Sequence, residues 1–393
     1  MSNSFFLMFI NTVTLSIALF SANLLLSRTE KHHGDIALVT CLVSIAFVLS
    51  RSTLSDVSPY FAVNLLIFTL PTMFLIGPSF WCYVLSMTSK SNWLFRRHHL
   101  KHFSLALLGW CIATTTLFLP DEIKHHLLIQ GTDQYIPTYS TPMQYLVYCL
   151  VLSTFMLVLF WAVQTAYYYV KIIKRLRQYR FYLKEIFSSK DTKELYWLSF
   201  ILLSIGILWL LATINITLSN LGNAAPVNDA VFSIIGLIMT WILAQWGLRQ
   251  KPGFEELYQT TQGKQHLQTA NKYQHSALDQ TRAQHIASQI EKAMKEDKLY
   301  LDAALSLPKL AKHISTSANY ISQTLNQNLS TSFFDYVNHH RIEAAKRLLT
   351  NTEETVLDIA MQVGFNAKSS FYTAFKKETQ MTPSQYRKTH LNS

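Results

Sequence analysis

The stretch TVLDIAMQVGFNAKSSFYTAFKKETQMTPSQYR, residues 355–387, decides how the C-terminal part of this chain folds. It opens with Thr355 and Asp358, a pair that starts a helix because both side chains can satisfy free N–H groups of the first turn. Gly364 and Phe365 end that helix. Between Thr355 and Gly364, apolar residues recur at i, i+3, i+4 and i+7. They predict one buried helix face: Val356, Ile359, Ala360 and Val363.

A second helix is predicted over residues 367–378. Phe371 and Phe375 lie four residues apart and form its inward stripe. The opposite face carries polar side chains: Lys368, Ser369, Tyr372 and Thr373. A helix, a glycine turn and a polar-faced second helix form a helix-turn-helix, which we place at residues 355–378.

The same unit occurs once before, at residues 306–328. Its apolar pattern lies 49 residues upstream of the pattern that begins at Val356 (356 − 307). The pattern consists of Leu307, Leu310, Ala311 and Ile314. Ser306 is the expected N-cap, and Pro308 lies in the first turn, where a missing N–H is harmless. Ser315 to Ser317 make the turn. In the second helix, Ile321 and Leu325 point inward, and the predicted outward residues are Asn319, Tyr320, Ser322 and Gln323.

One long helix over residues 332–349 is expected to join the two motifs, buried through Phe334, Val337, Ile342, Ala345 and Leu349. This arrangement resembles the AraC/XylS family of transcription regulators, and the resemblance implies a DNA-binding domain at residues 276–393. The residues that carry it are Asp358-Ile359-Ala360, Gly364-Phe365, Phe371, Phe375-Lys376-Lys377, Thr382-Pro383 and Tyr386-Arg387.

The resemblance also implies which side chains contact DNA. Polar residues on a helix in the major groove pair with base edges, and the matching positions are Asn319, Ser322, Gln323, Lys368, Ser369, Tyr372 and Thr373. For any single residue the alternative is a merely solvated side chain. Phosphate contact is expected from Lys376, Lys377 and Arg387, with a structural pairing left open for Arg387. The family often has glycine after each second helix, where this chain has Ser330 and Gln380, and a substitute there should cost about 1 kcal/mol or end the helix differently.

The first two-thirds of the 393 residues have a different composition. Charged residues are 15% of the whole chain and are absent from long stretches, which is typical of a membrane protein. Seven apolar stretches precede the linker, at about 4–26, 36–50, 60–86, 103–119, 144–170, 195–219 and 228–248. We therefore expect an all-α chain with a seven-transmembrane-helix sensor domain at residues 1–250. Pro71 and Pro78 should kink the third span.

Loop charges predict the orientation, because Lys and Arg stay on the cytoplasmic side. Loops one, three and five carry fourteen of these residues, and loops two, four and six carry two. Eight of the fourteen are in loop five, where a lipid-facing role is the first expectation: Lys171, Lys174, Arg175, Arg177, Arg180, Lys184, Lys190 and Lys193. The expected location is the bacterial inner membrane, with the N-terminus outside and the C-terminal domain in the cytoplasm.

A Gln-rich stretch at residues 251–275 is interpreted as a cytoplasmic linker. From Arg282 onward, 14 Lys and Arg face 10 Asp and Glu, a net charge of +4 that suits phosphate contact. The four cysteines follow no ligand spacing, and His98, His99 and His102 lack partners at fixed offsets, so no metal and no cofactor is expected. No nucleotide or hydrolase motif is present, and we expect no enzyme activity.

The sequence thus predicts a membrane-embedded one-component transcription regulator whose partners are double-stranded DNA, the lipid bilayer and an unidentified small-molecule or envelope signal, with a homodimer left open. The alternatives are a transporter or receptor-like protein with an accessory regulatory domain, and a soluble regulator with a vestigial anchor. A transporter usually needs ionisable groups at membrane depth, which the spans lack. The polar residues inside spans have two readings, a ligand pocket or interhelical hydrogen bonds: Asn11, Asn23, Asn64, Gln164 and Asn215.

Overall fold

The computed structural model describes residues 2–28, 33–57, 59–89, 93–130, 136–189, 195–220, 229–250, 252–254 and 279–391. Within these ranges every regular element is a helix, and extended pairing is limited to one isolated bridge between Phe187 and Ser306. The all-α prediction is therefore confirmed for the described chain. Most of the predicted linker, residues 255–275, lies outside the described residues, as do Lys190, Lys193 and the side chain of Asn215.

The chain divides into two compact units. Unit 1 contains residues 1–175 and 195–252, and unit 2 contains residues 176–194 and 253–393. The expected boundary lay in the linker alone, so the assignment of residues 176–194 to unit 2 is new information. This segment includes most of predicted loop five.

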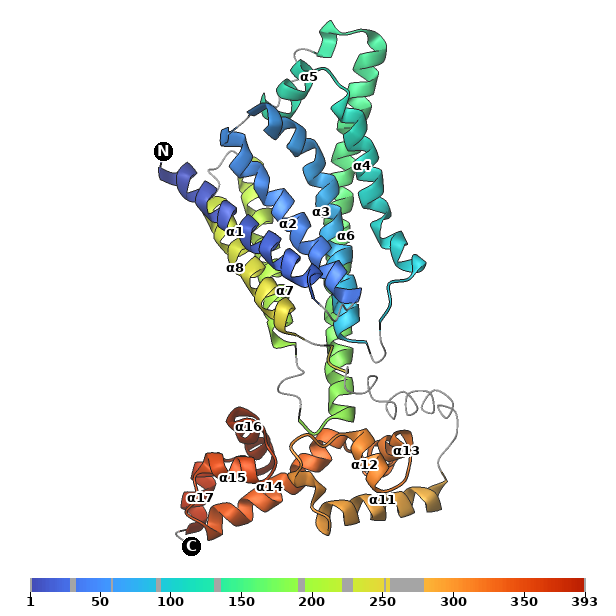
Figure 1. Cartoon of the computed structure of the whole chain (residues 1–393), viewed down its shortest axis with the longest axis vertical. Helices are drawn as coiled ribbons and strands as arrows, with labels where there is room; N and C mark the ends of the chain where they lie inside the picture. Colours follow the sequence, from blue (N-terminus) through green and yellow to red (C-terminus); the bar gives the residue numbers. More distant parts are fainter. Residues whose placement is uncertain are drawn as a thin grey trace. The chain divides into compact units, whose positions relative to one another are not determined.

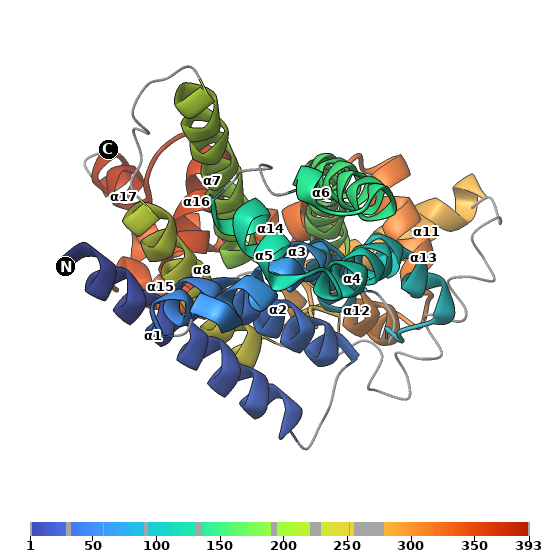
Figure 2. The same cartoon turned by 90° about the horizontal axis from the view of Figure 1, so that it is seen from above.

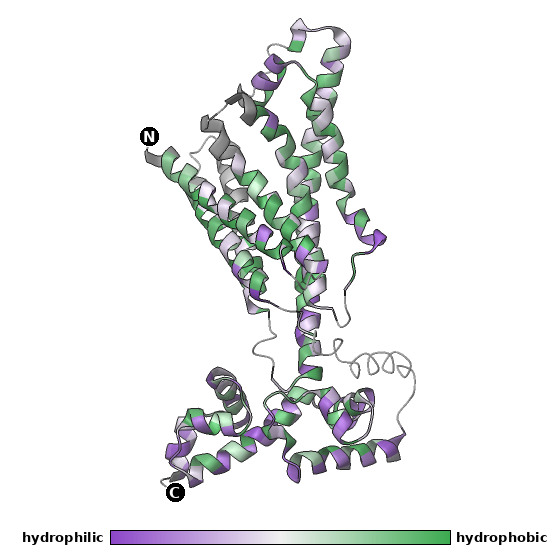
Figure 3. Ribbon diagram, viewed as in Figure 1, coloured by the Kyte–Doolittle hydropathy of each residue, from purple (hydrophilic) through white to green (hydrophobic). Residues whose placement is uncertain are grey.

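Unit 1 is a bundle of apolar helices, coloured predominantly for hydrophobic residues in Figure 3. Helix α2 packs against both α1 and α3, α1 packs against α8, and α3 packs against α4 (Figures 1 and 2). The bounds are α1 Ser2–Leu26, α2 His33–Val57, α3 Pro59–Met87, α4 Ser104–Leu117, α5 Asp121–His125, α6 Thr141–Ile186, α7 Tyr196–Asn220 and α8 Asp229–Arg249.

Five described helices are long and apolar enough to cross a membrane: α1, α2, α3, α6 and α8. Helix α4 has 14 residues, fewer than the roughly 20 that a spanning helix needs. The described apolar part of α7 is short, at Tyr196–Ile207. Both prolines predicted to kink the third span, Pro71 and Pro78, lie inside the continuous helix α3.

Helix α6 is longer than the sequence pattern predicted. Its apolar stretch was expected to end near residue 170, but the helix continues to Ile186. The cations assigned to loop five from Lys171 to Lys184 therefore lie on a helix. One of them, Arg175, donates from Nε to Thr88 Oγ1 at 2.8 Å and from a terminal nitrogen to the Thr88 carbonyl at 3.0 Å, within unit 1.

Unit 2 consists of short helices around one long helix, α14. Their bounds are α11 Gln280–Lys295, α12 Leu307–His313, α13 Ala318–Gln323, the π-helical turn η5 Thr324–Asn328, α14 Phe333–Asn351, α15 Val356–Gln362, α16 Lys368–Thr379 and α17 Pro383–Leu391. Apolar and polar residues alternate on these helices in Figure 3, as expected for a unit with its own small core. The order reproduces both predicted motifs and the helix that joins them.

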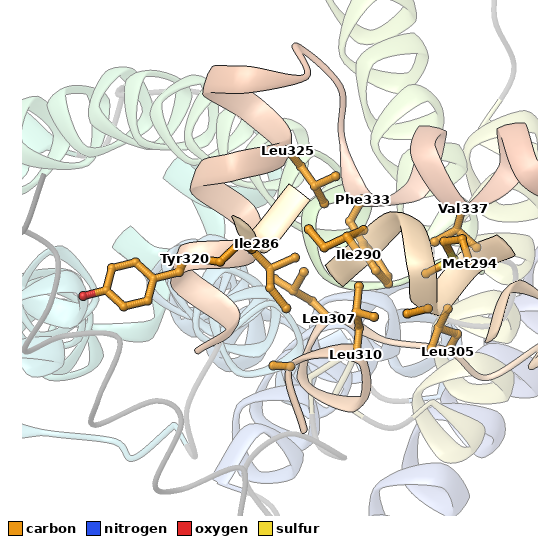
Figure 4. Close-up of a cluster of buried hydrophobic side chains, with 13 residues drawn as sticks. Ile286, Ile290, Met294, Leu305, Leu307, Leu310, Tyr320, Leu325, Phe333 and Val337 are labelled. Carbon is orange, nitrogen blue, oxygen red and sulfur yellow. The ribbon is translucent and has the colours of Figure 1, made fainter. Parts of the chain in front are cut away.

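Two separate apolar cores lie along α14. The first gathers side chains of α11, α12, α13 and η5 with Phe333 and Val337 of α14 (Figure 4). The second gathers side chains of α15 and α16 with Ile342, Ala345 and Leu349 of α14. One helix therefore contributes to both helix-turn-helix halves.

Two side chains differ from the predicted pattern. Phe333, not Phe334, is the buried aromatic residue at the start of α14, because it lies four residues before Val337 on the face that enters the first core. Tyr320 was predicted to face outward but is only 9% exposed, since its ring packs against the first core and lies 4.4 Å from the Arg282 guanidinium carbon. The ring points away from the centre of that core in Figure 4, and the Arg282 guanidinium lies against it.

Candidate nucleic-acid interface

The second helix-turn-helix begins and turns as the sequence predicted. The hydroxyl of Thr355 accepts a hydrogen bond from the backbone N–H of Asp358 at 3.2 Å, which caps α15. Gly364 then takes a φ of +94° after the helix ends. A Cβ at this position would lie 2.6 Å from the carbonyl oxygen of Tyr300 and 3.1 Å from Nε of Arg341. Only glycine fits this turn without displacing its neighbours.

Helix α16 presents the polar face expected of a recognition helix. Phe371 and Phe375 are fully buried in the second core, which fixes the orientation of the helix. On the opposite side Lys368, Ser369 and Thr373 are exposed. Tyr372 is half-buried, and the Lys368 ammonium lies 5.4 Å from the centre of its ring.

The first motif is less open. Its second helix is α13, continued by the turn η5, and Ser317 caps it by accepting from the Tyr320 N–H at 3.2 Å. The three candidate base-contacting side chains are all half-buried: Asn319, Ser322 and Gln323. The Gln323 Oε1 atom is buried and has no hydrogen-bond partner among the described residues.

The three candidate phosphate contacts differ in their surroundings. Lys376 is exposed on α16. Lys377 forms an ion pair with Asp335 of α14, with Nζ 2.7 Å from Oδ1. Arg387 donates to the carbonyl oxygens of Leu349 at 3.1 Å and Glu354 at 2.7 Å, which is the structural pairing that the sequence left open. Lys376 is thus the candidate whose ammonium is best placed for a phosphate.

Both positions where the family often has glycine adopt the left-handed conformation. Ser330 has a φ of 48° and Gln380 a φ of 61°. The second helices therefore end with the glycine-type geometry although neither residue is glycine, and each substitution carries the expected cost of about 1 kcal/mol.

Sequence reasoning missed the residue that connects the two halves, Arg341. It is fully buried on α14 between the residues that enter the first core and those that enter the second. A lone arginine in the middle of a predicted helix gave no signal of burial, because arginine is almost never fully buried unless it is paired. One feature of the sequence could have indicated its burial: Arg341 lies between two apolar stretches of the helix, 333–337 and 342–349.

Two of the oxygen atoms that accept hydrogen bonds from Arg341 belong to Ser188, which lies just after the end of α6. The sequence pattern assigned this region to the membrane domain. The Arg341 guanidinium donates to the Ser188 carbonyl oxygen and to the Ser188 hydroxyl, both at 3.1 Å. It also donates to the carbonyl oxygens of Tyr300 at 2.7 Å and Asp302 at 2.9 Å.

The described residues contain no group of three or more His, Cys, Asp or Glu side chains that could hold a metal ion. Of the candidate pocket residues, Gln164 donates to the Phe74 carbonyl oxygen of a neighbouring helix at 3.5 Å, the interhelical role considered above.

Comparison with known proteins supports the interpretation of unit 2. Residues 310–389 match a family model described as a helix-turn-helix domain. An uncharacterized HTH-type transcriptional regulator of Staphylococcus aureus (strain COL) is 37% identical over 112 residues, 28% of this chain and 14% of that protein. The melibiose operon regulatory protein of Escherichia coli (strain K12) is 36% identical over 87 residues, 22% of this chain and 29% of that protein. The chain therefore spans less than a third of either relative.

A solved structure is also similar, the C-terminal domain of the two-component response regulator yesN from Fusobacterium nucleatum. It is 36% identical, and the match covers 26% of this chain and 98% of that one, with a TM-score of 0.24. The two motifs and the sequence matches identify residues 310–389 as a helix-turn-helix domain similar to that of transcription regulators. More narrowly, residues 310–389 resemble the DNA-binding domain of AraC/XylS-family transcription regulators.

Proposed function

We propose that this protein is a membrane-embedded one-component regulator, in which residues 1–250 cross the bacterial inner membrane seven times and sense a signal. Residues 276–393 bind specific DNA sites in the cytoplasm, and the N-terminus lies outside. In this proposal the membrane part and the DNA-binding part act as one molecule, without a separate kinase or receptor.

The observation that carries the membrane assignment is the exposed apolar surface of unit 1. On α6 the outward side chains of Phe155, Leu159 and Val163 are 56%, 48% and 67% exposed. Contiguous apolar surface of this kind is costly in water and is matched by lipid chains. The apolar stretches around α4 and α7 are assigned as the remaining two spans on the sequence pattern.

In DNA binding, the exposed face of α16 is the better placed of the two recognition faces. Lys368, Ser369, Tyr372 and Thr373 read base edges there, and Asn319, Ser322 and Gln323 read the neighbouring groove segment. Lys376 supplies a phosphate contact that positions the helix. Lys377 and Arg387 contribute to phosphate binding less directly, because both already have partners within the domain.

The test of DNA reading uses the full chain in lipid nanodiscs and a matched pair of lysines on α16. Lys368→Ala should lower the preference for the specific site by about 1 to 3 kcal/mol, whereas Lys376→Ala should weaken all sequences similarly and reduce the salt dependence. Affinities for specific and scrambled duplexes, measured at several salt concentrations, separate the two effects. Equal effects of both substitutions on the two duplexes would contradict the assigned recognition face.

The test of membrane topology uses reporter fusions. A fusion at Thr132 should report an external location and a fusion at Gln262 a cytoplasmic one, because fourteen of sixteen loop cations lie on the side assigned to the cytoplasm. A cytoplasmic signal from both fusions would exclude the seven-span orientation while leaving DNA binding untouched.

A further inference from the structure

The seam between the two helix-turn-helix halves is an interaction surface of unit 2. We define the seam as Arg341 with the backbone at Tyr300–Asp302 and the turn Gly364–Asn366. These parts meet closely, since a Cβ on Gly364 would contact both the Tyr300 carbonyl oxygen and Arg341. A chain segment that occupies this seam therefore contacts both helix-turn-helix halves.

A short piece of chain fills it: residues 185–189, here named the docking segment, at the end of α6 and just after it. Ser188 is 1% exposed and Phe187 is 4% exposed. The Ser188 carbonyl and hydroxyl oxygens both accept from the Arg341 guanidinium. Because a fully buried cation is costly unless its donors are satisfied, the two acceptor oxygens of Ser188 stabilise Arg341 in its buried position.

The docking segment holds the first half through backbone and side-chain contacts. The Ser188 N–H donates to the Leu305 carbonyl oxygen at 3.1 Å, and the Ser188 hydroxyl donates to the same oxygen at 2.7 Å. Phe187 pairs with Ser306, the N-cap of α12. Glu185 accepts from the Asn326 carboxamide at 2.7 Å, at the end of the first recognition element.

The same segment also holds the second half. The Asn366 carboxamide donates to the Ser189 hydroxyl at 3.0 Å. Asn366 lies in the turn directly before α16, two residues ahead of Lys368. The docking segment therefore contacts the chain next to both recognition elements, and it leaves Lys368, Ser369 and Thr373 exposed.

Helix α6, which ends in this segment, is also fixed within unit 1. Arg175 binds the hydroxyl and carbonyl of Thr88 at the end of α3, ten residues before Glu185. The helix is continuous between these two attachments (Figure 1).

We propose that the docking segment fixes the two helix-turn-helix halves in the arrangement that binds two successive major-groove segments, and that α6 passes the sensed signal to DNA through it. This inference rests on the proposed function. Two recognition helices on one domain must keep a set separation to enter neighbouring groove segments. A segment that bridges both halves beside their recognition elements controls that separation.

The test is a substitution that expels the segment without touching the recognition faces. Ser188→Gln places a longer side chain where a serine is 1% exposed, and it should lower the affinity of the full chain in nanodiscs for its specific duplex by about tenfold, within the usual range of coupling between sites. Ser288→Gln makes the same change at an exposed serine of α11 and should leave the affinity unchanged. Hydrogen exchange of α15 and α16 verifies that the second half stays folded.

A cysteine pair tests the docking itself. Ser189→Cys with Asn366→Cys replaces two side chains in hydrogen-bond contact, so a short bifunctional thiol crosslinker should join them and preserve specific DNA binding. Failure of the pair to crosslink in the reconstituted full chain would overturn the proposal, as would wild-type affinity in folded Ser188→Gln protein. Absence of specific binding by the wild-type chain would instead reject the proposed function.

Independently, the geometry points to a ligand site inside unit 1. A cavity of about 270 Å³ lies between α2, α3, α6, α7 and α8. Its lining is almost wholly apolar, with Trp161, Met73 and Met239 among the contributors, and with hydroxyl groups from Thr165, Tyr168 and Thr240. A Cβ on Gly236, which also lines the cavity, would have no atom within 4 Å.

The lining fits an uncharged, mainly apolar small molecule that carries one or two hydroxyl or carbonyl groups. All lining residues lie in described helices, and none of them is Asp, Glu, Lys, Arg or His. A charged ligand would stay unpaired there, and a sugar would leave most of its hydroxyls unsatisfied. An alkyl alcohol or ketone of the kind that partitions into a bilayer meets both conditions.

The probe is a ten-carbon alcohol that carries a photoreactive diazirine, applied to the full chain in nanodiscs. Labelling near Met73 and Met239 should be displaced by unlabelled decanol and should fall several-fold in Gly236→Leu, which fills the cavity. Ile234→Phe adds bulk at an exposed position of the same helix and should leave labelling unchanged. Labelling confined to the outward residues of α6, with no effect of Gly236→Leu, would mean a lipid-exposed surface only and would reject the site.

Discussion

Lys377 of α16, the second helix of the second helix-turn-helix, forms an ion pair with Asp335 in the first turn of α14, with 2.7 Å between Nζ and Oδ1. Burial alone would raise the pKa of Asp335, but hydrogen bonds from Lys377 and Ser332 outweigh it and hold that pKa below the usual range. The pair ties the recognition helix to the helix that carries both halves.

The lowered pKa of Asp335 predicts a loss of local stability in acid. A carboxyl group whose pKa is depressed on folding contributes its stability above the unfolded pKa of about 3.9 and loses it as the pH falls through the folded value. Because both partners are partly exposed, the contribution is at most about 1 kcal/mol. Hydrogen exchange of the α16 amides in the full chain should therefore report a smaller opening free energy below pH 4, and Asp335→Asn should remove that part of the pH dependence.

Arg341 gives a larger stability effect. Arg341→Lys keeps the charge but cannot supply the planar fork that reaches Tyr300, Asp302 and Ser188 together. With buried acceptors left unpaired, we expect a loss of about 3 kcal/mol in the free energy of unfolding of unit 2. The matched control is Arg347→Lys on the exposed side of the same helix, which should change it by less than about 0.5 kcal/mol. Similar values for both variants would mean that the buried hydrogen bonds contribute little.

The left-handed residues after the two recognition elements predict a gain in stability. Gln380 has a φ of 61°, so Gln380→Gly should stabilise unit 2 by about 1 kcal/mol, because glycine adopts this conformation without a side-chain clash. Lys376→Gly, four residues earlier and inside the helix at an exposed position, should destabilise by a similar amount. A loss of stability in Gln380→Gly would show that contacts of the glutamine side chain outweigh its backbone strain.

Local patterns were enough to predict the helix-turn-helix halves. Thr355, Gly364 and the Phe371 and Phe375 pair each act within a few residues, so spacing alone defined the second motif, and its repeat defined the first. The phase at Phe333 and the burial of Tyr320 depend on where α11 packs, which spacing cannot specify. The open face of α16 and the half-buried face of α13 differ for the same reason.

The contacts of α6 were beyond prediction because they join residues far apart in the chain. The cations from Lys171 to Lys184 predicted a cytoplasmic loop. That interpretation did not anticipate the hydrogen bond from Arg175 to Thr88. Ser188 and Arg341 are 153 residues apart, and neither belongs to a recognisable motif. One feature of the sequence is consistent with a long α6. Between residue 143 and residue 225, Gly and Pro are absent except at Gly206 and Gly222, so no helix breaker lies near residue 170.

The two connections to the DNA-binding helices predict opposite results for two insertions. The Gln-rich linker was first interpreted as a flexible tether, whereas the docking segment attaches α6 directly to the seam. A ten-residue Gly-Ser insertion after Gly263 should therefore change the output of a target promoter by less than about twofold, since a flexible insertion of this size adds little to the reach of the chain.

The second insertion places two residues after Arg177, between the Thr88 attachment and the docking segment. In a helix of 3.6 residues per turn, two added residues rotate the part of α6 that follows them by about 200°. That insertion should abolish the response, and a seven-residue insertion at the same place, close to two full turns, should restore part of it. Loss of output from the linker insertion, with normal output from the two-residue insertion, would assign signal transmission to the linker and reject the role of α6.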